Sequence, residues 1–297
     1  MSNPVFENSP HFGEKRRGRN VPSSTPNGYP VHPGYAPGGT TGTMAPPVPS
    51  PTDRQFEHLT QSYQQPSAGP VNTGRMTYDD VIIKTGGLLT LVIAMAAVNW
   101  FLLGGNMIVT IGGLVVGLVL GLVNAFKKEP SPALIAGYAA AEGLFLGGIS
   151  MFFELMYPGI VLQAVLATVA TFVATLVLFK SGTIRVTPKL TRFVLIALVG
   201  YALFSLVNIG VMLFGSGDAA WGLRSSVEIM GIPLGVFVGI FAVGLAALCL
   251  IMDFDAIKRG VEQGAPARFA WSAAFGLLVT LVWLYLEFLR LIAILRN

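Results

Sequence analysis

The chain has 297 residues, of which 53% are hydrophobic and only 11% are charged, and its formal net charge is +4. A soluble globular chain carries about 25% charged residues, so this composition excludes a water-facing surface over most of the chain. The three histidines (His11, His32 and His58) precede the apolar region and Cys249 is the single cysteine. Histidine-based catalysis, histidine metal sites in the apolar region and an internal disulfide are therefore excluded.

Residues 1–75 are predicted to be a disordered cytoplasmic tail. Thirteen of the 19 prolines lie between Pro4 and Pro70. The apolar residues there are too sparse and aperiodic to offset the entropy of ordering. Met1 is not followed by the apolar segment of a cleaved signal peptide. Tyr29, Tyr35 and Tyr63 lie among the prolines and are candidate docking points for a partner protein.

Residues 76–297 are predicted to form one all-α, polytopic transmembrane domain in contact with the lipid bilayer. A bilayer core of about 30 Å needs roughly 20 apolar residues in a helix, because the backbone must satisfy its own hydrogen bonds in lipid. Seven runs have this character, at residues 82–103, 107–126, 133–153, 160–179, 192–214, 232–252 and 269–295. Glycines spaced four apart on the second, third and sixth runs predict close helix packing.

Basic residues fall on alternate loops between these runs. The second, fourth and sixth loops hold nine: Lys127, Lys128, Lys180, Arg185, Lys189, Arg192, Lys258, Arg259 and Arg268. The odd-numbered loops hold one, Arg224. The positive-inside rule then predicts a cytoplasmic N-terminus and an external C-terminus. The net positive charge is thus a signal of topology, and no interleaving of basic and aromatic residues indicates nucleic-acid binding.

Ionisable residues inside the apolar runs are the candidates for function, because they are costly to place in a membrane. Glu142 lies in the middle of the third run. It is either a buried acid, kept neutral or hydrogen-bonded to a neighbouring helix, or part of a proton or ion path. Asp253 and Asp255 close the sixth run and lie about 200° apart around a helix, so they cannot both face the interior. Asp255 is spaced to pair with Lys258 or Arg259, which leaves Asp253 as the better inward candidate.

Glu287 and Arg290 lie on one face of the seventh run, three residues apart. One interpretation is an internal ion pair that makes their burial tolerable. The other is a carboxylate in a water-accessible cavity that meets Asp253 or Glu142 across the bundle. Two carboxylates held close share one proton, so such a pair responds to pH and can act as a latch. Asp253 and Glu287 could also bind calcium transiently, although calcium prefers six to eight oxygens.

The chain resembles the transmembrane Bax inhibitor motif family, and more narrowly its bacterial YccA-type branch. The resemblance covers residues 84–295. It rests on a sixth helix ending in Met252-Asp-Phe-Asp-Ala-Ile-Lys258 and a seventh containing Leu284-Tyr-Leu-Glu-Phe-Leu-Arg-Leu291. It implies a central seventh helix wrapped by the other six, and residence in a bacterial inner membrane. For some members it also implies a pH-sensitive calcium leak controlled by aspartates on helices six and seven.

Asp253 matches the first of these two aspartates. Aligning on Arg290 puts Thr280 at the position of the second, and Glu287 then lies seven residues later on the same face. Aligning on the string Tyr-Leu-acid instead matches Glu287 directly but requires a longer loop. The first alignment is preferred because it needs less insertion.

Two classes of function remain. One is a passive cation leak, for calcium, controlled by protons through Asp253 and an acid on the seventh helix. The other is a membrane-embedded regulator or scaffold that binds other membrane proteins, such as proteases, with the tail as a contact. An enzyme is not expected, because no nucleophile–base set, phosphate-binding loop or cofactor motif is found. No cofactor is predicted apart from transient calcium.

Overall fold

The computed structural model describes residues 74–182, 186–214 and 222–296. The predicted tail, apart from its last two residues, lies outside the described residues, as does Arg185. Among the described residues, seven helices are long and apolar enough to cross a membrane, which confirms the predicted number. They are α4 (Tyr78–Ala97) with its π-helical continuation η1 (Val98–Leu102), α5 (Met107–Phe126), α6 (Pro132–Met156), α7 (Ile160–Lys180), α8 (Pro188–Phe214), α10 (Leu234–Glu262) and α11 (Ala270–Arg296).

The connection between α8 and α10 carries structure of its own. It contains a short helix, α9 (Leu223–Ser226), and a two-stranded antiparallel hairpin of β1 (Glu228–Ile229) and β2 (Ile232–Pro233). A 3₁₀ turn, η2 (Ala267–Phe269), leads into α11. The predicted fifth loop is therefore partly folded, and its one basic residue, Arg224, lies on α9 and is only 2% exposed.

The apolar run of the sixth span ends at residue 252, but helix α10 continues to Glu262. It thus extends four residues past Lys258, where the sixth helix was expected to end. Two ion pairs at spacing four explain the extension. Asp255 pairs with Arg259 at 2.9 Å, and Lys258 pairs with Glu262 at 3.8 Å. Charged pairs of this kind stabilise a helix outside the apolar layer, which a search for apolar runs does not detect.

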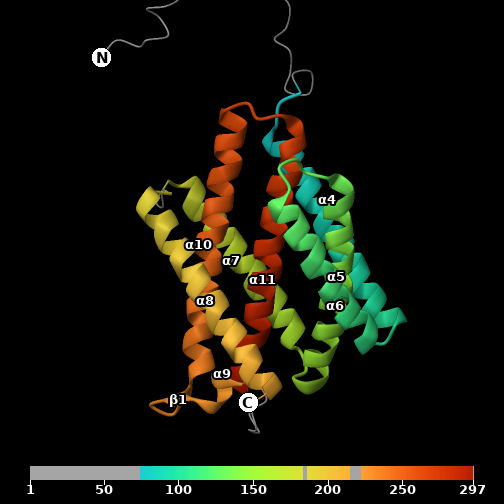
Figure 1. Ribbon diagram of the computed structural model, residues 1–297, viewed down its shortest axis with the longest axis vertical. Coiled ribbons are helices and arrows are strands. Elements are labelled where there is room, and N and C mark those ends of the chain that lie inside the picture. The colour runs from blue at the N-terminus through green and yellow to red at the C-terminus, as the bar shows by residue number, and fades with distance from the viewer. Residues whose placement is uncertain (1–73, 183–185, 215–221, 297) are drawn as a thin grey trace, which may run out of the picture. The chain divides into compact units, whose positions relative to one another are not determined.

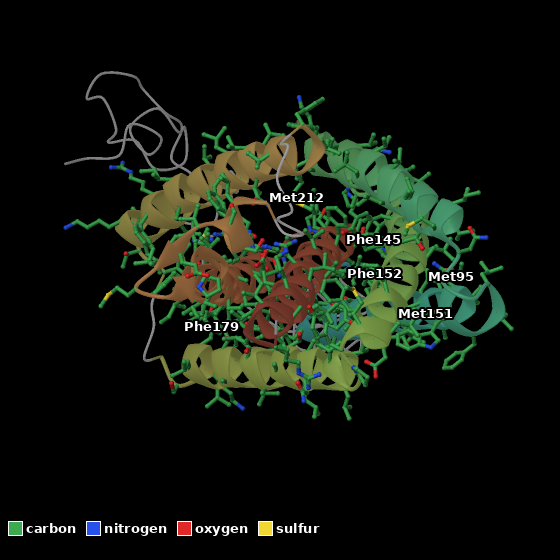
Figure 2. The ribbon with its side chains drawn as sticks, turned by 90° about the horizontal axis from the view of Figure 1, so that it is seen from below. Met95, Phe145, Met151, Phe152, Phe179 and Met212 are labelled. Carbon is green, nitrogen blue, oxygen red and sulfur yellow. The ribbon has the colours of Figure 1, made fainter. Side chains whose placement is uncertain are left out.

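Helix α11 is the central helix of the bundle, as the family resemblance implied. It packs against α4, α6, α7 and α10, and it lies between them in Figure 1. Seen along the bundle in Figure 2, its ribbon is enclosed by the other helices. Helix α5 packs chiefly against α6, whereas α8 packs mainly against α10. Apolar side chains on the outer faces of α4, α5, α7 and α8 are exposed, as expected for surfaces that contact lipid.

Contacts between loops show which ends of the helices share a side of the membrane. Met76, before α4, donates its backbone N–H to the carbonyl of Ala265 between α10 and α11, at 2.7 Å. Arg268 pairs with Glu129 of the second loop at 3.1 Å. At the opposite end, Arg296 donates to the carbonyl of Pro158 in the third loop, at 3.0 Å. The chain therefore alternates between the two sides as the charge pattern predicted.

Close helix contacts occur at the predicted glycines. A Cβ on Gly147 of α6 would collide with the backbone of Ala96 on α4. A Cβ on Gly113 of α5 would lie 2.7 Å from the carbonyl oxygen of Ala141 on α6. Backbones approach this closely only where side chains are absent, so these glycines fix α6 between α4 and α5.

Candidate functional site

Asp253 and Thr280 join α10 to the central helix. The Thr280 hydroxyl donates to Asp253 Oδ2 at 2.7 Å, and it also lies 3.1 Å from the carbonyl oxygen of Gly276. Asp253 makes no ion pair among the described residues. The carboxyl group thus meets a neutral hydroxyl at the position where the preferred alignment put the family's second aspartate.

Asp255 lies on another face of α10. Its ion pair with Arg259 follows the predicted spacing, and its side chain is 20% exposed. The two aspartates therefore face different directions, as predicted. Asp253 is turned toward α11, and Asp255 pairs with a basic residue of its own helix.

Glu142 is buried between α5 and α6. Its Oε2 atom lies 2.9 Å from the point that a Cβ on Gly117 would occupy, so the absence of a side chain there gives the carboxyl group its space. The residue is 8% exposed. Within residues 74–182, 186–214 and 222–296 it has no hydrogen bond or ion pair, so the expected bond to a neighbouring helix is not observed.

Glu142 and Asp253 lie at similar depths in the bundle, but Glu142 faces α5 whereas Asp253 faces α11. Glu142 is ten residues from the start of α6 and Asp253 is nine residues from the end of α10, and both ends are on the tail side. At 1.5 Å per residue these offsets are about 15 Å and about 14 Å. One turn before Glu142, the Tyr138 ring packs edge-on against Phe275 of α11 with centroids 5.1 Å apart, and Gly276 lies beside Asp253.

Glu287 belongs to a second, separate cluster near the other end of α11. Arg290 donates to its Oε1 atom at 2.7 Å, which confirms the ion-pair interpretation. Arg224 of α9 lies 3.4 Å from its Oε2 atom. The Tyr201 hydroxyl of α8 donates to Oε1 and accepts from Arg224 at 2.9 Å. Glu287 is 1% exposed, so its charge is held almost entirely by these three side chains.

The structure does not bring Asp253 and Glu287 together. Thr280, the partner of Asp253, precedes Glu287 by seven residues on α11, or about 10 Å along the helix. Both oxygens of Glu287 are engaged by basic or hydroxyl groups. No group of three or more metal-ligating side chains occurs in the described part of the chain. The shared-proton pair and the joint calcium site expected of these two acids are thus not formed in this conformation.

Sequence reasoning missed Arg224 and Tyr201 as partners of Glu287. Tyr201 gave no signal, because a tyrosine in an apolar run is common and its contact lies 86 residues away along the chain. Arg224 did give one. It was the single basic residue in the odd-numbered loops, and a basic side chain that is buried in a protein is usually paired.

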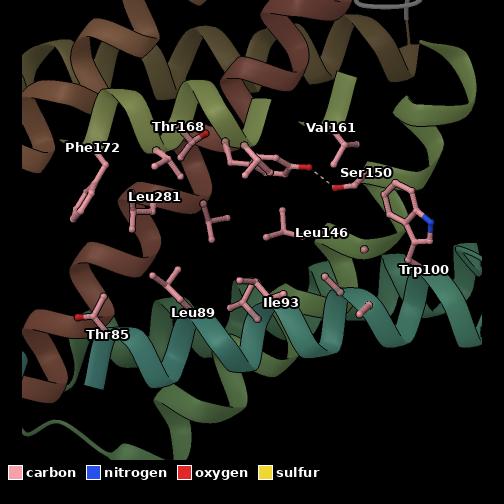
Figure 3. Close-up of a pocket in the computed structure, with 18 of the residues that line it drawn as sticks. Thr85, Leu89, Ile93, Trp100, Leu146, Ser150, Val161, Thr168, Phe172 and Leu281 are labelled. Atoms are coloured by element: carbon pink, nitrogen blue, oxygen red, sulfur yellow. Dashed lines mark hydrogen bonds between the residues drawn. The ribbon is translucent and has the colours of Figure 1, made fainter. Parts of the chain in front are cut away.

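An apolar groove runs between α4 and α7 (Figure 3). Its volume is about 570 Å³, and its floor is formed by α6 and α11. It extends from Thr85 to Trp100, which is about 22 Å along α4. Its internal polar contact joins Ser150 to Tyr285 at 2.7 Å (Figure 3). Exposed side chains such as Ile93 and Val169 line its edge, so the groove opens toward the lipid.

Comparison with known proteins agrees with this architecture. No curated protein matches the chain in sequence. The model of the family described as Bax inhibitor 1 like matches residues 3–297. That match covers the seven spans and the acids on α10 and α11, and the chain belongs to the Bax inhibitor 1 like family.

Proposed function

We propose that the protein is a proton-sensitive cation leak, with calcium as its first candidate ion, and that Asp253 is the group that responds to protons. The observation that carries this proposal is the contact between Asp253 and Thr280. The Asp253 carboxyl group lies where α10 contacts the central helix, and its partner there is a neutral hydroxyl rather than a basic group. Intramembrane acids without a basic partner are rare and are concentrated in ion and proton paths.

The sign of the pH dependence follows from the charge of Asp253. Protonated, the carboxyl group is neutral and does not attract cations. Ionised, it presents a negative charge to a cation that moves between α10 and α11. The leak is therefore expected to increase as the pH rises. Glu142, at a similar depth on α6 and without an ion-pair partner among the described residues, is a candidate for a second proton-sensitive acid, although its carboxyl group faces α5 rather than α10 and α11.

The test is calcium entry into liposomes that contain the purified full-length chain and a trapped calcium-sensitive dye. The proposal predicts entry above that of protein-free vesicles, increasing with pH. Repeating the measurement with sodium and potassium indicators determines whether the path selects calcium. Entry equal to that of empty vesicles at every pH would reject a transport function.

The second candidate function is binding of another membrane protein, and the groove between α4 and α7 supports it. A cleft of about 570 Å³ that opens to lipid fits the apolar face of a transmembrane helix. Photocrosslinking groups at Ile93 and Val169 would then capture one defined partner in cells, whereas lipid adducts alone would argue against this function. Deletion of residues 1–75 tests whether the tail contributes to capture.

The proposed location is a bacterial inner membrane with the N-terminus in the cytoplasm. The nine basic residues of the even-numbered loops, against Arg224 in the odd-numbered loops, support this orientation, and exposed Arg296 is the exception on the outer side.

A further inference from the structure

A polar cavity lies beside the Glu287 cluster. Its volume is about 360 Å³, and it is bounded by α8, α9 and α11. Its polar lining comprises Tyr201, Ser205, Asn208, Arg224, Glu287 and Arg290. Trp283 and Met212 supply an apolar wall. The cavity is separate from the Asp253–Thr280 contact, which lies about two turns closer to the start of α11.

The charges around the cavity do not cancel. Arg224 and Arg290 each carry a positive charge, whereas Glu287 is the one acid paired with either of them within the described ranges. The cluster therefore carries one excess positive charge. Arg224 is 2% exposed, so solvent screens little of its charge, whereas Arg290 keeps 32% of its side chain exposed. A buried excess charge is costly, and a bound counter-ion removes that cost.

Hydrogen-bonding groups in the cavity are also left unused. Ser205 Oγ is buried, lines the cavity and has no hydrogen-bond partner among the described residues, so its hydroxyl is free to donate. Asn208 Oδ1 is also without a partner there, but an amide oxygen only accepts, so it does not contribute to binding an anion. The described contacts of Arg224 use two of its five N–H donors, one toward Glu287 and one toward Tyr201. A hydroxyl and spare guanidinium donors facing the same space suit an oxygen-rich anion.

We propose that this cavity binds a singly charged oxyanion, held by Arg224 and Arg290 with the Ser205 hydroxyl as a further donor. One negative charge makes the cluster neutral. The phosphodiester of an anionic lipid headgroup and free phosphate share this chemistry. Access is from the end of the bundle where Arg290, one turn nearer the end of α11 than Glu287, keeps 32% of its side chain exposed. This inference is independent of the cation leak.

Two substitutions with opposite expected effects test the proposal. Arg290→Gln removes the excess charge and should weaken oxyanion binding by about tenfold or more, as for loss of one charge-assisted hydrogen bond. Glu287→Gln raises the excess charge and should strengthen binding by a similar factor. A variant that merely misfolds loses binding, so stronger binding by Glu287→Gln cannot arise from damage. Lys128→Gln, at an exposed lysine, is the control and should leave binding unchanged.

The measurement is the thermal unfolding midpoint of the full-length chain in a neutral detergent, titrated with each probe. The probes are inorganic phosphate, phosphatidylglycerol and, as the uncharged comparison, phosphatidylcholine. A rise with phosphatidylglycerol alone identifies a lipid headgroup, and a rise with phosphate identifies a free oxyanion. Either result supports the site if the two variants shift the response in the stated directions.

Asp218, in the segment 215–221 that the structure does not describe, is the chain's own alternative source of negative charge. Under the proposal, the Asp218→Asn variant binds the probe with the same affinity as the wild-type chain. Binding that appears only in this variant would overturn the proposal, as would no response of the wild-type chain to phosphate or phosphatidylglycerol. An equal response by Arg290→Gln and the wild-type chain would also overturn it.

Discussion

Asp253 Oδ2 of α10 accepts a hydrogen bond of 2.7 Å from the hydroxyl of Thr280 on α11. This contact joins an ionisable group to the helix around which the bundle is built. It also separates the two acids that the sequence suggested as a pair, because Glu287 is held by two arginines and a tyrosine about two turns away. The chain thus has one acid–hydroxyl contact and one paired acid in place of two facing carboxylates.

Thr280→Val should destabilise the protein. Valine keeps the branched shape but removes the donor, so the Asp253 carboxyl group loses its hydrogen bond inside the bundle. Loss of a partner for a buried polar group costs about 1–3 kcal/mol. Thr280→Ser retains the hydroxyl and is the matched control. Chemical unfolding in mixed micelles measures the difference, and equal stability of the valine and serine variants would contradict the role of the hydrogen bond.

Glu287→Ala should be among the most damaging single substitutions. It leaves Arg224 and Arg290 without their shared carboxylate, and breaking a buried ion pair costs about 3–5 kcal/mol. Glu262→Ala is the control because its pair with Lys258 is more than half exposed, and such pairs contribute about 0–1 kcal/mol. Unfolding midpoints of the two variants should therefore differ widely. Similar midpoints would mean that the Glu287 cluster contributes little to stability.

The glycines of α6 give a packing prediction with an internal control. Gly147→Ala should push α6 away from Ala96 of α4, and overpacking of this kind costs about 1–3 kcal/mol. Gly112→Ala on α5 places its methyl group in open space and should be tolerated. The yield of folded protein in size-exclusion chromatography distinguishes the two. An intact Gly147→Ala variant would mean that α4 and α6 are packed less closely.

The membrane orientation can be tested with a thiol reagent that does not cross membranes. Met230, in the turn between β1 and β2, is 97% exposed and lies on the side assigned to the exterior. Met230→Cys should be labelled in intact cells, whereas Lys128→Cys should be labelled only after lysis. The labelling of each variant is compared with that of the parent chain, which contains one cysteine, Cys249, within α10. The reverse pattern would invert the topology.

The helices could be predicted from the sequence because each depends on a local run of apolar residues. The last turn of α10 was missed, although the spacing of Asp255 and Arg259 had indicated helix there, because Lys258 and Glu262 stabilise an extension whose composition resembles a loop. The pairing of Glu287 with Arg290 could also be predicted, because residues three apart in a helix lie on the same face. The contacts of Glu287 with Tyr201 and Arg224 join three separate elements, so they depend on tertiary packing that no sequence spacing encodes.

The inward direction of Asp253 was predicted by eliminating Asp255, and the structure supplies its partner. Glu142 illustrates the opposite case. Its position in the middle of a span indicated that it would be buried, but of the two alternatives for a buried acid, the hydrogen-bonded one is not observed within the described residues. The space that accommodates its carboxyl group is created by Gly117 on another helix, and the sequence does not show which helix that would be.

The most direct test of the proposed function compares two aspartates of α10 in the same flux assay. Calcium entry into proteoliposomes is measured across a range of pH for the wild-type chain, Asp253→Asn and Asp255→Asn. Asp255 pairs with Arg259, so its substitution should preserve the pH dependence of the wild-type chain. Asp253→Asn removes the group facing Thr280 and should give a flux that no longer changes with pH. A pH profile of Asp253→Asn identical to that of the wild-type chain would contradict the proposed role of Asp253.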